Sequence, residues 1–172
     1  PDTNGRDEIR SFMTIVGTAA STRVRIEATA DIIPGGPIMQ RVPRGAPIEI
    51  TLSPFDVLNL ETGAFLADFT GSLVTADRPV ALFSGTECSD VPFWRTFSDR
   101  QAACDHIEEQ NFPLEAAGQA YVLSRSPTRS RALLQAGARV AEVNEPEWFR
   151  VLNASSRPAR GTTTLPEDIA NP

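Results

Sequence analysis

No lysine occurs in the 172 residues, so all 16 basic side chains are arginine. Because a guanidinium stays protonated, this absence excludes lysine Schiff-base chemistry and a neutral amine base. No run of about 18 apolar residues occurs either, which argues against a membrane-spanning helix and against membrane insertion. The net charge of −6 argues against binding nucleic acid or anionic lipid through the whole surface.

Metal-ligating and catalytic motifs are also scarce. The chain has two cysteines, separated by fifteen residues, and one histidine, whereas a structural zinc site needs four ligands with closely spaced pairs. There is no D-x-D-x-D-G calcium loop, no G-x-S-x-G, no phosphate-binding P-loop and no glycine-rich dinucleotide fingerprint. We therefore expect no metal and no cofactor.

What the sequence does contain is a series of short apolar stretches of strand type. "RVRIEAT" and "IEITLS" alternate apolar and polar residues with period two, and turn residues separate such stretches at intervals of about eight to twelve. This pattern predicts an all-β sandwich of short antiparallel strands, with few short helical turns. The predicted strands are 12–17, 23–29, 48–53, 56–60, 72–76, 79–84, 120–124 and 148–153. The predicted core comprises Phe12, Ile15, Val24, Ile26, Ile50, Leu52, Val57, Leu60, Val80, Leu82, Phe83, Val122 and Phe149.

Helical signals are few. The stretch 103–110, "ACDHIEEQ", carries carboxylates suited to the start of a helix, and 113–120 could form one helical turn. The Ala/Leu-rich segment 129–143 could be a short helix or a loop, because Gly137 interrupts it. The proline- and glycine-rich stretch 31–47 is predicted to be a loop or a sheet edge.

Cys88 and Cys104 allow several interpretations. They could be buried free thiols, half of a metal site, or a nucleophile paired with His106, although Cys104 and His106 would share a face only on a strand. If the protein is exported, a disulfide between them is favoured. Closing a loop of about 17 residues would then contribute roughly 3 kcal/mol in the chain-entropy model.

The loop between the cysteines has the composition of a contact surface. It carries the aromatic residues Phe93, Trp94 and Phe97 beside Arg95 and Arg100. These five residues, with His106, form the predicted ligand-binding set, although the aromatics could instead pack back onto the sandwich. His106 could simply hydrogen-bond a neighbouring carboxylate such as Glu109.

Several segments in order resemble a known family. "FMTIVGT", "IEITLSPFDVLNLET", "DFTGSLVTADRPVALFSGTEC" and "CDHIEEQ" are similar to the N-terminal domain of the IgG Fc-binding protein family, over roughly residues 11–124 and more weakly over 147–165. The resemblance implies an extracellular β-rich module of a large secreted or surface protein, without known catalysis. No Fc-contact residues of the family can be placed on this chain.

We therefore expect a non-enzymatic extracellular module that binds a protein or glycan and adjoins further domains of a longer chain. The predicted organisation is a β-sandwich over residues 1–145, with 146–172 starting a further repeat or supplying terminal strands. Two alternatives stay open. The chain could be a spacer without a ligand, or a hydrolase using carboxylates such as Glu87, Asp90, Asp105 or Glu108.

Overall fold

The structure is a computed structural model that describes residues 10–64, 67–89, 104–124, 126–143, 149–154, 158 and 160–162. The chain forms two compact units, Pro1–Ala116 and Ala117–Pro172. All described strands belong to the first unit, and the α-helix α1 belongs to the second.

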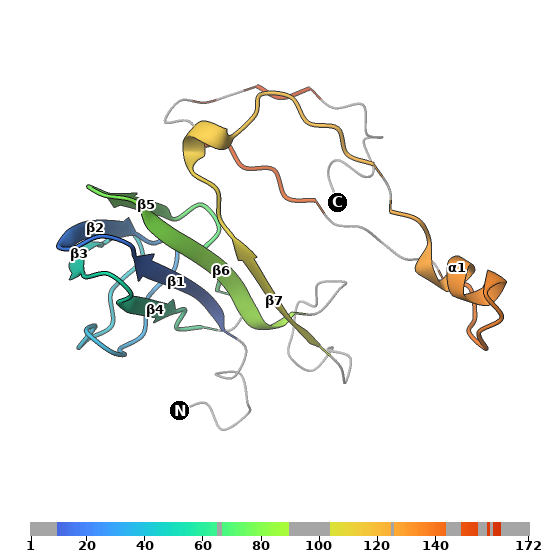
Figure 1. The fold of residues 1–172 in the computed structure, drawn as a ribbon, viewed down its shortest axis with the longest axis horizontal. Coiled ribbons are helices and arrows are strands. Elements are labelled where there is room, and N and C mark those ends of the chain that lie inside the picture. Colours follow the sequence, from blue (N-terminus) through green and yellow to red (C-terminus); the bar gives the residue numbers. More distant parts are fainter. Residues whose placement is uncertain are drawn as a thin grey trace. The chain divides into compact units, whose positions relative to one another are not determined.

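The first unit is built from two antiparallel sheets (Figure 1). The four-stranded sheet has the order β4 (Val57–Glu61), β1 (Ser11–Gly17), β6 (Val80–Ser89) and β7 (Asp105–Gln110). The three-stranded sheet has the order β3 (Pro47–Leu52), β2 (Thr22–Glu27) and β5 (Leu73–Ala76). Six predicted strands therefore match β1 to β6 within a few residues, apart from a longer β6, and the predicted all-β sandwich is confirmed.

Strand β2 illustrates how the alternating sequence produces this fold. Val24 and Ile26 are fully buried, whereas Arg23 and Arg25, which alternate with them, are exposed, because successive side chains of a strand point to opposite faces. On the exposed face Arg25 contacts Glu27 at 2.8 Å and Glu49 at 3.4 Å. The hydrogen bond to Glu27, followed by that to Glu49, raises the pKa of the Arg25 guanidinium.

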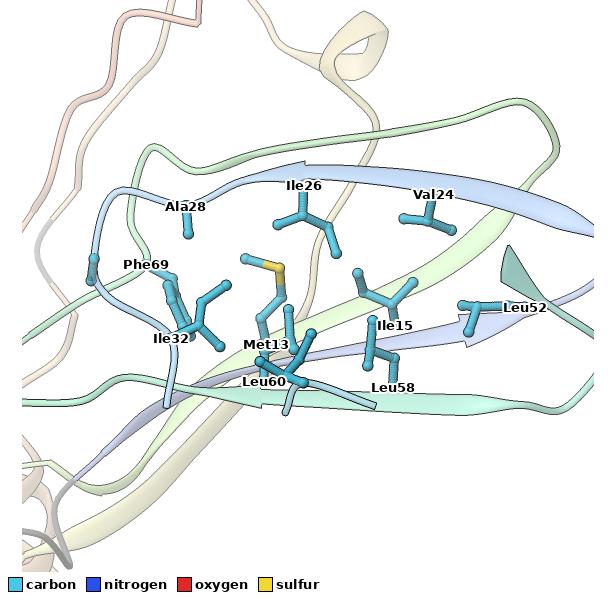
Figure 2. Close-up of a cluster of buried hydrophobic side chains, with 12 residues drawn as sticks. Met13, Ile15, Val24, Ile26, Ala28, Ile32, Leu52, Leu58, Leu60 and Phe69 are labelled. Atoms are coloured by element: carbon cyan, nitrogen blue, oxygen red, sulfur yellow. The ribbon is translucent and has the colours of Figure 1, made fainter. Parts of the chain in front are cut away.

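The core lies between the two sheets (Figure 2). Met13 and Ile15 of β1 and Leu58 of β4 point toward Val24 and Ile26 of β2. The predicted core members Ile15, Val24, Ile26, Leu52 and Leu60 are buried, and Ile50, Val80 and Leu82 are partly buried against them. Transferring such apolar surface from water is the main stabilising contribution to a fold of this kind.

Five predicted core residues lie elsewhere. Val57 is 63% exposed because β4 directs Leu58 and Leu60 inward, which turns Val57 outward. Phe12 and Phe83 are partly buried on the opposite face of the four-stranded sheet, since Met13 and Leu82 take the inward positions. Val122 and Phe149 are exposed in the second unit.

The proline-rich stretch 31–47 is mainly a loop, as predicted, with β3 beginning at Pro47. Ile32 and Val42 form an isolated bridge with backbone hydrogen bonds of 2.9 and 3.0 Å. The bridge helps to place Ile32 and Ile38 in the core cluster, beside Ala28 and Phe69. The loop thus extends the hydrophobic core beyond the ends of the strands.

The second unit contains α1 (Arg129–Gln135), which settles the ambiguous segment 129–143 as a short helix followed by irregular chain. Gly137, at φ 87°, ends the helix, and its N–H bonds to the Leu134 carbonyl at 3.0 Å. Arg131 contacts Glu142 at 2.6 Å, and this hydrogen bond raises the pKa of the Arg131 guanidinium.

Two predicted strands are wrong. Residues 120–124 and 149–153 form no strand in the structure, and residue 148 lies outside the described part. One predicted helical element is confirmed: a 3-10 turn at Leu114–Ala116 lies within the stretch 113–120, for which one helical turn was expected. None of the described helices has the length and hydrophobicity needed to cross a lipid bilayer.

Candidate functional site

The candidate site is built on the β6–β7 hairpin at one edge of the four-stranded sheet. β6 is ten residues long and pairs with β1 on one side and β7 on the other. Near its end the register with β7 shifts between Thr86 and Ser89, which is the signature of a β-bulge. Pairing continues beyond the irregularity, because Ser89 is opposite Asp105 at the start of β7.

A disulfide between Cys88 and Cys104 closes this end of the hairpin. The two Cα atoms are 5.2 Å apart, within the range that a disulfide bridges without backbone movement. Cys88 is the next-to-last residue of β6, and Cys104 directly precedes β7. The bond therefore ties the two strands together at the base of the intervening loop, which confirms the disulfide-tethered loop.

Residues 90–103 lie outside the described part of the structure. The predicted ligand-binding residues in this segment are Phe93, Trp94, Arg95, Phe97 and Arg100, and Asp90 was a candidate carboxylate. Their contribution to binding stays a prediction. What the structure does fix is the covalent base on which this loop is mounted.

His106 lies in strand β7. The start of a helix that the sequence suggested at 103–110 is therefore not formed. The ring of His106 stacks on Phe12 of β1 at a centroid distance of 5.6 Å and an interplanar angle of 12°. Its Nε2 is 3.4 Å from Glu108 Oε2. A neighbouring carboxylate is therefore the partner, as expected, but it is Glu108 and not the example Glu109, because residues i and i+2, not i+3, share a face of a strand.

The stack between Phe12 and His106 depends on Gly85 of the intervening strand β6. A Cβ added at Gly85 would lie 2.7 Å from the Phe12 Cζ atom and would also collide with the Ile107 carbonyl oxygen. Glycine is therefore required where these strands approach. The sequence signal for this close approach is a glycine in the interior of a strand, in the run "VALFSGTEC".

Polar residues continue the same outer face toward β4. Thr14 Oγ1 donates to Asn59 Oδ1 at 2.7 Å, and Asn59 Nδ2 donates to Glu61 Oε1 at 3.2 Å. Arg10 Nη1 bonds the other carboxylate oxygen of Glu61 at 2.9 Å. The result is a face with an aromatic pair on one side and a connected polar row on the other.

The described residues of the site are suited to contacts with a ligand through aromatic, polar and charged side chains. Both cysteines are in the disulfide, so neither supplies a thiolate nucleophile. The candidate carboxylates Glu87, Asp105 and Glu108 lie on exposed strand positions. Among the described residues no group of three His, Cys, Asp or Glu side chains is placed to hold a metal ion.

Fold and site together define a disulfide-tied antiparallel β-sandwich that presents a loop between two neighbouring strands. A profile of the family described as IgGFc binding protein matches residues 2–156. The chain therefore belongs to the IgGFc binding protein family, which confirms the resemblance.

A relative in the same family supports this assignment. The chain is 30% identical to the human IgGFc-binding protein over an alignment of 131 residues, and this alignment covers 76% of the chain. The matched region amounts to only 2% of the length of the human protein. No solved structure matches the chain significantly.

Proposed function

We propose that this chain is an extracellular, non-enzymatic module that binds a protein ligand through the loop closed by Cys88 and Cys104. The observation that carries the proposal is the disulfide at the base of the loop, in a chain of the IgGFc binding protein family. Disulfides persist in oxidising compartments and are rare in the cytosol, which supports an extracellular location.

The composition of the loop supplies the recognition chemistry. Aromatic and arginine side chains are enriched at the centres of protein interfaces, and Phe93, Trp94, Arg95, Phe97 and Arg100 all fall between the two cysteines. A covalent closure lowers the entropy that such a loop loses on binding, because fewer conformations are accessible to it beforehand. His106 stands two residues after Cys104, on an exposed position of β7.

The name of the human relative states that it binds the Fc region of immunoglobulin G. An Fc fragment is therefore the first probe for this chain. An array of extracellular proteins and glycans is the second, because aromatic and arginine side chains also suit adhesion to sugars. The matched region is only 2% of the human protein, so its Fc binding is a starting point for the choice of probe and not a property carried over to this chain.

The test compares two double variants with the same kinds of residue removed. Trp94→Ala with Arg95→Ala alters the loop. Phe55→Ala with Arg78→Ala removes an exposed aromatic and an exposed arginine from turns at the start of β6, about 30 Å from the Ser89 end of that strand. We expect the first pair to lose at least about tenfold in affinity and the second to bind like the unmodified protein.

Two results would contradict the proposal. Equal binding by both double variants removes the loop from recognition. Absence of binding to every probe favours the spacer, in which the module connects domains of a longer chain. Turnover of an array glycan would instead favour the hydrolase that uses carboxylates.

A further inference from the structure

The outer edge of β7 is a second surface with unused binding capacity. β7 is the last strand of its sheet, and all six of its residues are exposed. In the portion of the chain that the structure describes, no further strand pairs with it. An unpaired edge presents a row of backbone donors and acceptors to other chains.

The register shows which backbone groups of β7 face outward. The Asn111 N–H donates to the Leu82 carbonyl at 2.8 Å, which makes this pair a hydrogen-bonded one. Because bonded and non-bonded pairs alternate along antiparallel strands, Ile107 and Glu109 also bond toward β6. The N–H and C=O groups of Glu108 therefore point away from β6, and those of Gln110 do the same.

The pairing of β6 with β1 independently identifies the same hydrogen-bonded pairs between β6 and β7. The Glu87 N–H donates to the Arg10 carbonyl at 3.0 Å, so the β6 residues in phase with Glu87, including Gly85, bond toward β1. The β6 residues between them, Ser84 and Thr86, are left to bond toward β7. The His106 N–H also points away from β6, and it donates to the side-chain Oδ1 of Asp105 at 2.9 Å. Among the described residues of β7, the outward backbone groups of Glu108 and Gln110 therefore remain to bond another chain.

The side chains of β7 determine what can pair with this edge. Asp105, Glu108 and Glu109 give the strand three carboxylates and no arginine in six residues. Pairing with a second copy would place six carboxylates along one seam, and like charges directly opposite each other destabilise a strand pair. Ile107, 49% exposed, adds an apolar contact on the core-side face.

We propose that the outer edge of β7 accepts an extended segment of a partner protein, rich in arginine or lysine, as an additional strand of the sheet. The backbone groups of Glu108 and Gln110 bond the segment, and its basic side chains face the carboxylates of β7. Addition of a strand to a sheet edge is an established mode of peptide recognition. The proposal goes beyond the loop, because it uses none of the residues 90–103.

The probe is a synthetic peptide of about eight residues that alternates arginine and valine, which matches the period of a strand. In the expected pairing its arginines share the face of Asp105 and Glu109, which holds two of the three carboxylates, and its valines share the face of Glu108. A version N-methylated at every residue keeps the charge and loses the backbone donors. We expect fluorescence anisotropy to show binding of the first peptide and at least about tenfold weaker binding of the second.

Glu108→Pro removes an outward N–H while leaving the bonds of β7 to β6, and it should weaken the peptide at least about tenfold. The matched control is Ala76→Pro on the exposed edge of β5. Asp77 N–H bonds to the Arg23 carbonyl at 3.1 Å, which places the N–H of Ala76 on the open side. The control should bind the peptide unchanged.

Hydrogen exchange keeps the test independent of variants that fail to fold. In the unmodified protein, the peptide should slow amide exchange at Glu108 and Gln110 and leave the other sheet edges unaffected. Equal binding of the N-methylated peptide would reduce the interaction to charge attraction and overturn the proposal. Absence of binding at about 1 mM peptide, or a dimer of this chain that Glu108→Pro abolishes, would overturn it as well.

Discussion

Replacing both cysteines with alanine tests how much the covalent tie contributes to the fold. The bond joins residues separated by 16 positions, Cys88 and Cys104, and in the folded state the ladder between β6 and β7 holds the same two strands together. The double variant should therefore keep the native topology. Its loss of stability then reports mainly on the unfolded chain, which gains freedom when the crosslink is absent.

The magnitude follows from loop closure. For about 17 residues in the closed loop, the chain-entropy relation gives about 10.5 cal/mol/K, or about 3 kcal/mol at 25 °C. With a urea m-value of about 2 kcal/mol/M, the unfolding midpoint of the first unit should fall by about 1.5 M. This loss is a large share of the 5–15 kcal/mol that is typical of a domain.

The assay is urea unfolding followed by far-ultraviolet circular dichroism, which reports on the strands. The unmodified protein under reducing conditions is the control, and its midpoint should coincide with that of the double alanine variant. A loss below about 0.5 kcal/mol would refute the reasoning, because it would mean that the crosslink does not restrict the unfolded chain. Loss of the strand signal without denaturant would also refute it, since the ladder alone would not hold the hairpin.

Three further results are expected. Gly85→Ala should destabilise the first unit by about 1–3 kcal/mol in urea unfolding, because no space exists for a Cβ between the strands; an effect near zero would contradict the described pairing of β6. Leu58→Ala should cost about 2–5 kcal/mol, whereas Val57→Ala beside it should stay within about 0.5 kcal/mol; the reverse order would mean that β4 is turned over. The side-chain hydrogen bond from Arg23 lowers the pKa of Asp77 below its ordinary 3.8, so this pair stabilises the fold above that pH and the contribution is lost as pH falls through the lowered pKa. Arg23→Ala should return the Asp77 pKa toward 3.8 in a titration followed by NMR, and an unchanged value would rule out this pair as the cause.

Alternation made β2 and β3 predictable from the sequence, whereas β1 was predictable from a short apolar run rich in β-branched residues. In β2 each apolar residue is followed by a charged one, so only one register buries Val24 and Ile26 together. β4 was harder, because "FDVLNLE" offers two possible inward sets. Val57 fits one set and Leu58 the other, and the sequence alone does not distinguish them. Pairing with β1 decides for Leu58, which is 1% exposed.

β7 could not be predicted from local pattern. "DHIEEQ" has one strongly apolar residue, Ile107, and carboxylates that suit the first turn of a helix. Its strand conformation comes from pairing with β6 and from the disulfide at Cys104, which are both tertiary effects. The segments 120–124 and 149–153 show the converse, because their apolar residues favour strands but no sheet partner is present for them in the described structure.

The candidate site was predictable in its covalent part. Two cysteines around an aromatic and arginine-rich segment predicted the closed loop between Cys88 and Cys104, which the structure confirms. The stack of His106 on Phe12 was not predictable, because it joins residues 94 positions apart and depends on the space left by Gly85. The division at residue 145 and the contacts of residues 90–103 stay predictions.

The central claim is that the loop between the two cysteines recognises a protein ligand outside the cell. Side-by-side affinities of three proteins for an immobilised ligand, beginning with an Fc fragment, test it most directly. The account predicts that the Trp94→Ala, Arg95→Ala protein binds at least about tenfold more weakly than both the unmodified and the Phe55→Ala, Arg78→Ala proteins. Indistinguishable affinities for all three would contradict it.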